Sequence, residues 1–150
     1  MIRDKLKAAQ IESMKSGDKS RLAAVRLILA KVKDRDIELR TATQLPDDET
    51  TVVEVLQKMV KQRRESIAMY ESGGRPELAA QEQVEIDVIE SFLPQQLSEA
   101  ETSAAIEAIK SELGATSLKD MGKVMAALKE KHGTVLDMSK ASGLVKAALG

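Results

Sequence analysis

Apolar residues recur every three or four positions along most of this 150-residue chain, with charged residues between them. That spacing is typical of amphipathic helices, each of which turns one apolar stripe toward a core. The first two predicted helices cover residues 2–16 and 18–39, with Gly17 as the stop of the first and Asp18 as the N-cap of the second. Their predicted apolar stripes consist of Ile2, Leu6, Ala9 and Ser13, and of Leu22, Val25, Leu29 and Val32, widened by Leu27 and Ile28.

Turn and capping residues divide the rest of the chain into five more predicted helices. A helix over 51–70 is followed by Gly73-Gly74, and Pro76 is suited to the first position of the next helix, over about 77–92. Ser98 and Glu101 form a capping-box pattern at the start of a fifth helix, and two short helices follow over about 117–131 and 139–149. Residues 134–136 are compatible with an extended conformation. The residues expected to be buried in these helices are Val52, Leu56, Met59, Val60, Ile67, Tyr70, Leu78, Ile86, Ile89, Leu93, Ile106, Ile109, Leu113, Leu118, Met121, Val124, Met125, Leu128, Leu144, Val145 and Leu149.

Together these patterns predict an all-α protein with an N-terminal antiparallel helical bundle and a small C-terminal three-helix domain. Leu93-Pro94 closes the fourth helix, so we place the boundary there and expect domains over residues 1–94 and 95–150. Composition supports this fold class, because Phe92 and Tyr70 are the only aromatic residues. A core of Leu, Ile, Val, Met and Ala suits helices, whereas sheets usually contain more aromatic residues.

The residue types needed for most catalytic and metal sites are missing from the sequence. It contains no cysteine and only His132, which stands in a C-terminal helical turn where an imidazole favours the helix dipole. We therefore expect no catalytic residue, no metal and no cofactor. No apolar run approaches the ~20 residues that span a bilayer, so we expect a soluble cytoplasmic protein with no membrane partner.

Charge is distributed unevenly although the net charge is only −1. Residues 1–40 carry +5, residues 41–93 carry −6, and residues 94–150 are neutral. On the third helix, Lys61 and Arg64 share one side, Arg63 lies near the apolar seam, and Arg75 precedes the Pro-initiated helix. These cations are interpreted equally well as a polyanion site or as ion-pair partners of Glu82 or Glu85 on the following helix.

The C-terminal third is rich in lysine around two glycines. Lys123, Lys131 and Lys140 stand on the short helices near Gly122 and Gly133. Small residues at these positions would let a nucleic-acid backbone approach, although a tight crossing between helices explains them equally well. We predict that these three lysines form a second anion-binding patch.

Three stretches of the chain together resemble a known family. They are RLAAVRLILAKVKDRDIELR, KQRRESIAMYESGGRPELAAQEQVEIDVIESFLPQQLSEAE and MGKVMAALKEKHG. The chain resembles the YqeY-like family over nearly its whole length, and its C-terminal third is similar to the tail domain of the B subunit of bacterial Asp/Glu-tRNA amidotransferase. In that enzyme the tail helps to hold the tRNA body, so the resemblance implies RNA binding. The stretch 122–125 and the turn 131–133 match the tail pattern, which implies a phosphate contact for Lys123.

Three functional hypotheses follow. The first is a non-catalytic module that binds structured RNA, with tRNA as the expected case, through phosphate contacts of Lys61, Arg63, Arg64, Arg75, Lys123, Lys131 and Lys140. The second is a tRNA-dependent amidotransferase-like carbon–nitrogen ligase with glutamine as amido donor, or an accessory that positions tRNA for such an enzyme or another tRNA-modifying enzyme. The third is a protein-interaction scaffold that binds no RNA. Because the catalytic cradle of the amidotransferase subunit has no counterpart here, we expect a non-catalytic chain.

Overall fold

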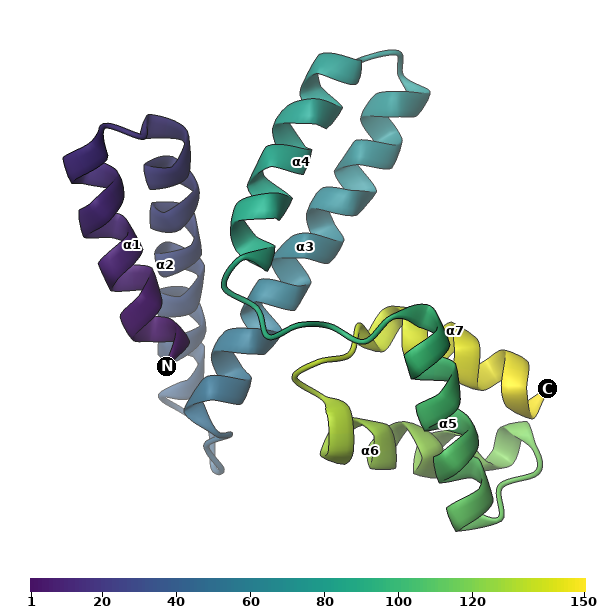
Figure 1. The fold of residues 1–150 in the computed structure, drawn as a ribbon. Coiled ribbons are helices and arrows are strands. Elements are labelled where there is room, and N and C mark those ends of the chain that lie inside the picture. Colours follow the sequence, from purple (N-terminus) through teal and green to yellow (C-terminus); the bar gives the residue numbers. More distant parts are fainter. The chain divides into compact units, whose positions relative to one another are not determined.

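The computed structural model describes the backbone of residues 1–150 and every side chain except that of Ser139. Its described backbone is all-α and contains no strand, which confirms the predicted fold class (Figure 1). The elements in chain order are α1 (Ile2–Ser16), α2 (Lys19–Leu39), α3 (Asp48–Ser72), α4 (Pro76–Glu90), α5 (Glu99–Leu113), the 3₁₀ helix η1 (Leu118–Asp120), α6 (Met121–His132) and α7 (Met138–Leu149). None of the described helices is both long and apolar enough to cross a membrane.

The chain divides into two compact units. Unit 1 comprises Met1–Leu93 and contains α1 to α4, and unit 2 comprises Pro94–Gly150 and contains α5, η1, α6 and α7. Each unit has its own cluster of buried apolar side chains.

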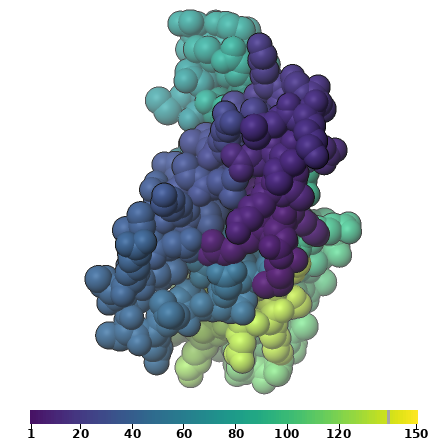
Figure 2. Space-filling view, turned by 90° about the vertical axis from the view of Figure 1, so that its left-hand side faces the viewer, coloured from purple at the N-terminus to yellow at the C-terminus, as the bar shows by residue number. Residues whose placement is uncertain are grey.

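Unit 1 consists of two antiparallel helical hairpins, α1 with α2 and α3 with α4 (Figure 1). Figure 2 shows α1 and α2 side by side on one face of this unit. The most extensive helix pairing is between α3 and α4, and α2 packs on both of them. The core of the unit is formed by Ile2, Leu6, Ala9, Val25, Ile28, Val32, Val52, Val53, Leu56, Met59, Val60, Ile86, Ile89 and Phe92.

Capping residues determine where the helices of unit 1 begin and end. Gly17 follows α1 with φ of 73°, a left-handed conformation that side chains with a Cβ rarely adopt. The Asp18 carboxylate accepts a hydrogen bond from the Arg21 N–H at the start of α2, as predicted. At α3 the cap is Asp47, so this helix begins at Asp48 and is longer at both ends than the predicted span of 51–70.

Unit 2 is a three-helix arrangement with η1 ahead of α6. The capping box at the start of α5 is present, because Ser98 Oγ accepts from the Glu101 N–H and Glu101 Oε1 accepts from the Ser98 N–H. At the other end of the unit, Lys110 Nζ donates to the Ala148 carbonyl in the last turn of α7. A cation at this place offsets the partial negative charge of a helix C-terminus.

Several local expectations for unit 2 were wrong. Residues 134–136 form turns and a bend, and the Leu97 N–H donates to the Val135 carbonyl in an isolated bond instead of a strand ladder. Leu113 and Leu118 are 47% and 48% exposed because each lies at the end of a helix, beyond the reach of the core.

One expectation for unit 1 was also wrong. Leu27 on α2 was predicted to widen the buried stripe, but it is exposed, and Ala24 is buried in that helix.

Candidate nucleic-acid interface

Arg63 lies on α3 and is held by the fold of unit 1. Its Nε donates to Glu85 Oε2 of α4 at 2.8 Å, and its Nη1 donates to the Met59 carbonyl at 3.2 Å. The side chain is only 12% exposed. The sequence predicted that Arg63 lies near the apolar side of α3, and its low exposure agrees with this. The ion pair with Glu85 is the contact between α3 and α4 that the sequence analysis gave as the alternative to RNA binding.

Arg64 and Arg75 are also paired within unit 1, although both are more exposed. Arg64 Nη2 lies 2.8 Å from Glu90 Oε1, and Arg75 Nε lies 2.8 Å from Glu77 Oε1. The Arg75 contact holds the pKa of the Glu77 carboxyl below its usual value. Exposed ion pairs of this kind contribute little stability, so a phosphate could compete for either guanidinium.

Lys61 differs from its three arginine neighbours in the predicted patch. Its side chain is exposed on α3, and it makes no hydrogen bond or ion pair with any other side chain that the structure describes. The predicted patch on unit 1 therefore contains one cation open to solvent and three that already contact carboxylates.

In unit 2, Lys131 forms an ion pair, whereas the ammonium groups of Lys123 and Lys140 form none with a described side chain. Lys131 Nζ lies 2.7 Å from Glu112 Oε2 of α5. Lys123 and Lys140 are exposed, and neither ammonium contacts a carboxylate among the side chains that the structure describes. Each of these two lysines is in the first turn of its helix, α6 or α7.

The helix dipole places partial positive charge at the N-terminal turns that carry Lys123 and Lys140. Backbone N–H groups at both helix starts are already engaged, because the Lys140 N–H donates to Asp137 Oδ1 at 3.3 Å and the Met121 N–H donates to the Leu118 carbonyl of η1. Helices α6 and α7 run in opposite directions in Figure 1, so their N-terminal turns lie at opposite ends of the pair. With twelve residues, each helix is roughly 18 Å long. The two lysines therefore stand at the starts of two different helices.

An ion-pair cluster that the sequence did not single out joins α1, α2 and α3. Arg3 Nη2 contacts Asp36 Oδ1 at 2.7 Å and Asp48 Oδ1 at 2.9 Å. The hydrogen bond from Arg3 lowers the pKa of Asp36, and the two carboxylates raise that of Arg3. Only the tertiary structure reveals this cluster, because its members are far apart in the sequence. It joins three helices and leaves little of the Arg3 charge available to a ligand.

A scan against protein-family models matches residues 3–149 to the family described as Yqey-like protein. The chain belongs to this family. Membership confirms the resemblance drawn from the three sequence stretches, and the match extends over both units.

Curated relatives of this Yqey-like chain include three fungal proteins. The protein named "Altered inheritance of mitochondria protein 41, mitochondrial" from Eremothecium gossypii is 31% identical over 82 residues, which are 55% of this chain and 43% of the relative. Its namesake in Saccharomyces cerevisiae is 29% identical over 90 residues, 60% of this chain and 47% of the relative. The Candida glabrata protein of the same name is 32% identical over 82 residues, 55% and 44% of the two chains. The matched part thus spans about half the length of these relatives.

The names of these relatives contradict the expected cytoplasmic location, because each is described as mitochondrial. The expectation rested on a composition without cysteine, which argues against disulfides but does not distinguish one reducing compartment from another. These names mention neither RNA nor an amidotransferase.

Proposed function

We propose that this Yqey-like chain is a non-catalytic helical module that binds structured RNA, with tRNA as the expected case, through lysine contacts to phosphates. The observation that carries the proposal is the position of Lys123 and Lys140 in the first turns of α6 and α7. Both are exposed, and neither ammonium group makes a hydrogen bond or ion pair with a described side chain. The resemblance of the C-terminal third to a tRNA-holding tail domain supports the same surface.

Within this proposal, unit 2 makes the main contacts and unit 1 has a secondary role. The Arg63 side chain is only 12% exposed, and a phosphate that binds its guanidinium must displace Glu85. This exchange loses a charge-assisted hydrogen bond. Lys61 needs no such exchange, and Arg64 and Arg75 need only the opening of exposed pairs. We therefore rank Lys123 and Lys140 first, Lys61 second, and Arg63 last.

Phosphate contacts of this kind give affinity without base readout. The net charge of −1 means that the whole-molecule field does not attract RNA, so local lysines must supply the attraction. Only Phe92 and Tyr70 are aromatic, which leaves little for stacking on single-stranded bases. Structured RNA, recognised by its backbone, is the partner that fits this chemistry.

The test is a fluorescence-anisotropy titration of labelled total tRNA with the full chain at about 50 and about 200 mM salt, where phosphate contacts weaken steeply. The double variant Lys123→Ala with Lys140→Ala should bind more weakly and reduce the salt slope by about 2, since each lysine that binds a phosphate accounts for about 1. The matched control is Lys7→Ala with Lys15→Ala, which removes the same charge from exposed lysines of α1. Equal losses in both double variants would show non-specific attraction and contradict the proposal, as would undiminished binding by the first.

The scaffold function is the second candidate, and the ion pairs of unit 1 favour it. Arg3, Arg63, Arg64 and Arg75 each contact a carboxylate of the same unit, so opposite charges in the first 93 residues neutralise one another. The Arg75 pair is local to the start of α4, and the other three join different helices. If this function holds, the full chain does not bind tRNA at either salt concentration. An accessory role in amidation needs RNA binding as well, and glutamine-dependent amide transfer would then appear only when a separate catalytic subunit is added.

A further inference from the structure

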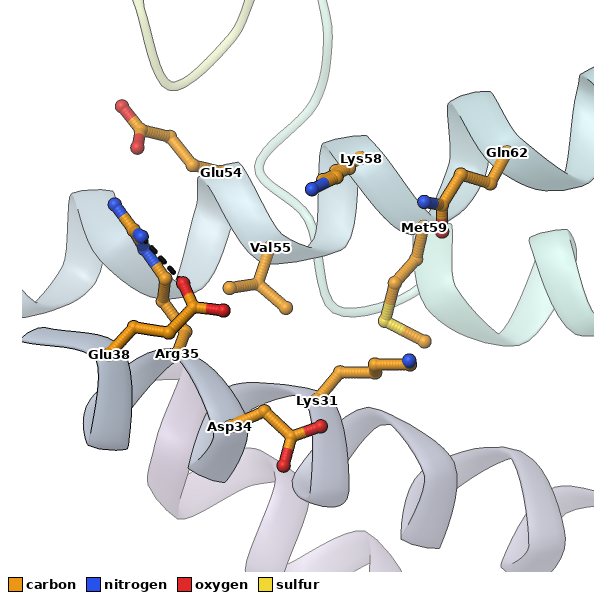
Figure 3. A pocket seen from close by; sticks show the side chains of 9 residues that line it. All are labelled: Lys31, Asp34, Arg35, Glu38, Glu54, Val55, Lys58, Met59 and Gln62. Atoms are coloured by element: carbon orange, nitrogen blue, oxygen red, sulfur yellow. Dashed lines mark hydrogen bonds and ion pairs between the residues drawn. The ribbon is translucent and has the colours of Figure 1, made fainter.

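A groove of about 390 Å³ lies within unit 1, between α2 and α3 (Figure 3). Its volume is within the roughly 300–1,000 Å³ of typical small-molecule sites. The lining side chains come from both helices and include apolar and charged groups. They are Lys31, Asp34, Arg35 and Glu38 from α2, and Glu54, Val55, Lys58, Met59 and Gln62 from α3.

Two cations in this groove are without an ion-pair partner among the described side chains. Lys31 on α2 and Lys58 on α3 are exposed, and neither ammonium makes a hydrogen bond or ion pair with another side chain that the structure describes. Figure 3 shows Lys31 extending from α2 toward Met59 of the facing helix, while the Lys58 side chain lies over its own helix, α3; both line the groove. Arg35 is different, because its Nη1 lies 2.8 Å from Glu38 Oε2 and its charge is already compensated.

The floor between the two lysines is apolar. Val55 is half-buried and Met59 is buried in the core of unit 1, and both line the groove. Gln62 stands one turn beyond Lys58 and adds an amide that can donate to an oxygen atom. An apolar surface with a few convergent polar groups is the usual composition of a small-molecule site.

We propose that the α2–α3 groove binds a small amphiphilic anion, whose single carboxylate or phosphate group lies between Lys31 and Lys58 while its apolar body covers Val55 and Met59. Two positive charges from opposite helices suit one anionic group. Asp34, Glu38 and Glu54 also line the groove and balance the charges of its three cations, so the lining as a whole does not attract a polyanion such as RNA. The proposal does not depend on the proposed RNA function, because the lysines belong to different units.

The experiment titrates the full ¹⁵N-labelled chain with octanoate and octyl phosphate, which distinguish the two anionic head groups, and follows amide shifts by NMR. At least one probe should bind saturably, with the largest shifts at residues 31, 58, 59 and 62. Octylamine and inorganic phosphate are the controls for charge and for the apolar body, and both should bind at least about tenfold more weakly than the better probe.

Two sets of variants locate the site. Lys31→Ala with Lys58→Ala should weaken binding of the better probe by roughly tenfold or more, whereas the charge-matched Lys7→Ala with Lys15→Ala should leave it unchanged. Val55→Ser should weaken the octyl probe without changing the spectrum of the free chain outside the groove. The proposal is overturned if neither probe saturates, if octylamine or inorganic phosphate binds as tightly as the better probe, or if the Lys31/Lys58 variant binds it normally.

Discussion

Replacing Arg63 by alanine tests whether this cation serves the fold of unit 1. The change removes the 2.8 Å bond to Glu85 and the 3.2 Å bond to the Met59 carbonyl, and it uncovers the space filled by a side chain that is 12% exposed. Hydrogen bonds of charged groups contribute about 1.5–3 kcal/mol. Glu85 is itself 41% exposed and regains water when Arg63 is replaced, which limits the cost. We therefore expect the free energy of unfolding of unit 1 to fall by about 2 kcal/mol.

The measurement is urea unfolding of the full chain followed by circular dichroism, with hydrogen-exchange mass spectrometry of α3 and α4 peptides to separate unit 1 from unit 2. Arg64→Ala is the matched control, since its pair with Glu90 is 45% and 43% exposed and should contribute less than about 1 kcal/mol. A double-mutant cycle of Arg63→Ala with Glu85→Gln should give a coupling of about 1 kcal/mol. The reasoning is refuted if Arg63→Ala costs no more than Arg64→Ala, or if the coupling vanishes.

Two further predictions concern unit 1. Ser13 is 1% exposed, and its Oγ has no hydrogen-bond partner among the described atoms. Ser13→Ala should therefore stabilise the chain by about 1 kcal/mol, measured by urea unfolding. An unchanged or lower unfolding midpoint would show that the hydroxyl is hydrogen-bonded. The pKa of Asp36 is lowered by its bond to Arg3, so the stability from this carboxylate is present above its unfolded value of about 3.8 and is lost as pH falls through the lower folded value. The stability difference between wild type and Asp36→Asn should therefore shrink on acidification from pH 5 to pH 2, and a difference that is constant over this range would contradict the assignment.

Helix boundaries were largely predictable from the sequence, because the signals for them are local. The carboxylate of Asp18 and the capping box of Ser98 act on backbone N–H groups within three residues, and Gly17 ends α1 through its own φ angle. These contacts form in nearly the same way whatever the rest of the fold does. The stripe of α1 was predicted completely for the same reason, since its four buried residues follow from helical periodicity alone.

The sequence did not show which cations form ion pairs and which remain open to solvent. Lys61 and Arg64 are three residues apart on α3, yet one is open to solvent and the other contacts Glu90, which is 26 residues further along the chain. The difference depends on which side of α3 faces α4. Periodicity indicated that Arg63 lies near the apolar side of α3. Which carboxylate, Glu82 or Glu85, accepts its hydrogen bond depends on the register of the α3–α4 hairpin.

By itself the sequence determined that this chain is helical, where most of its helices begin and end, and which family it resembles, because periodicity, caps and motifs act over a few neighbouring residues. Tertiary structure alone decided which charges remain available to a ligand and that a groove forms between α2 and α3. Ion pairs such as Arg3 with Asp36 and Asp48 join residues from three helices, and the groove opens only where two helices separate. The ion pairs and the groove both depend on distances between helices, and the pattern of residues along the sequence does not give these distances.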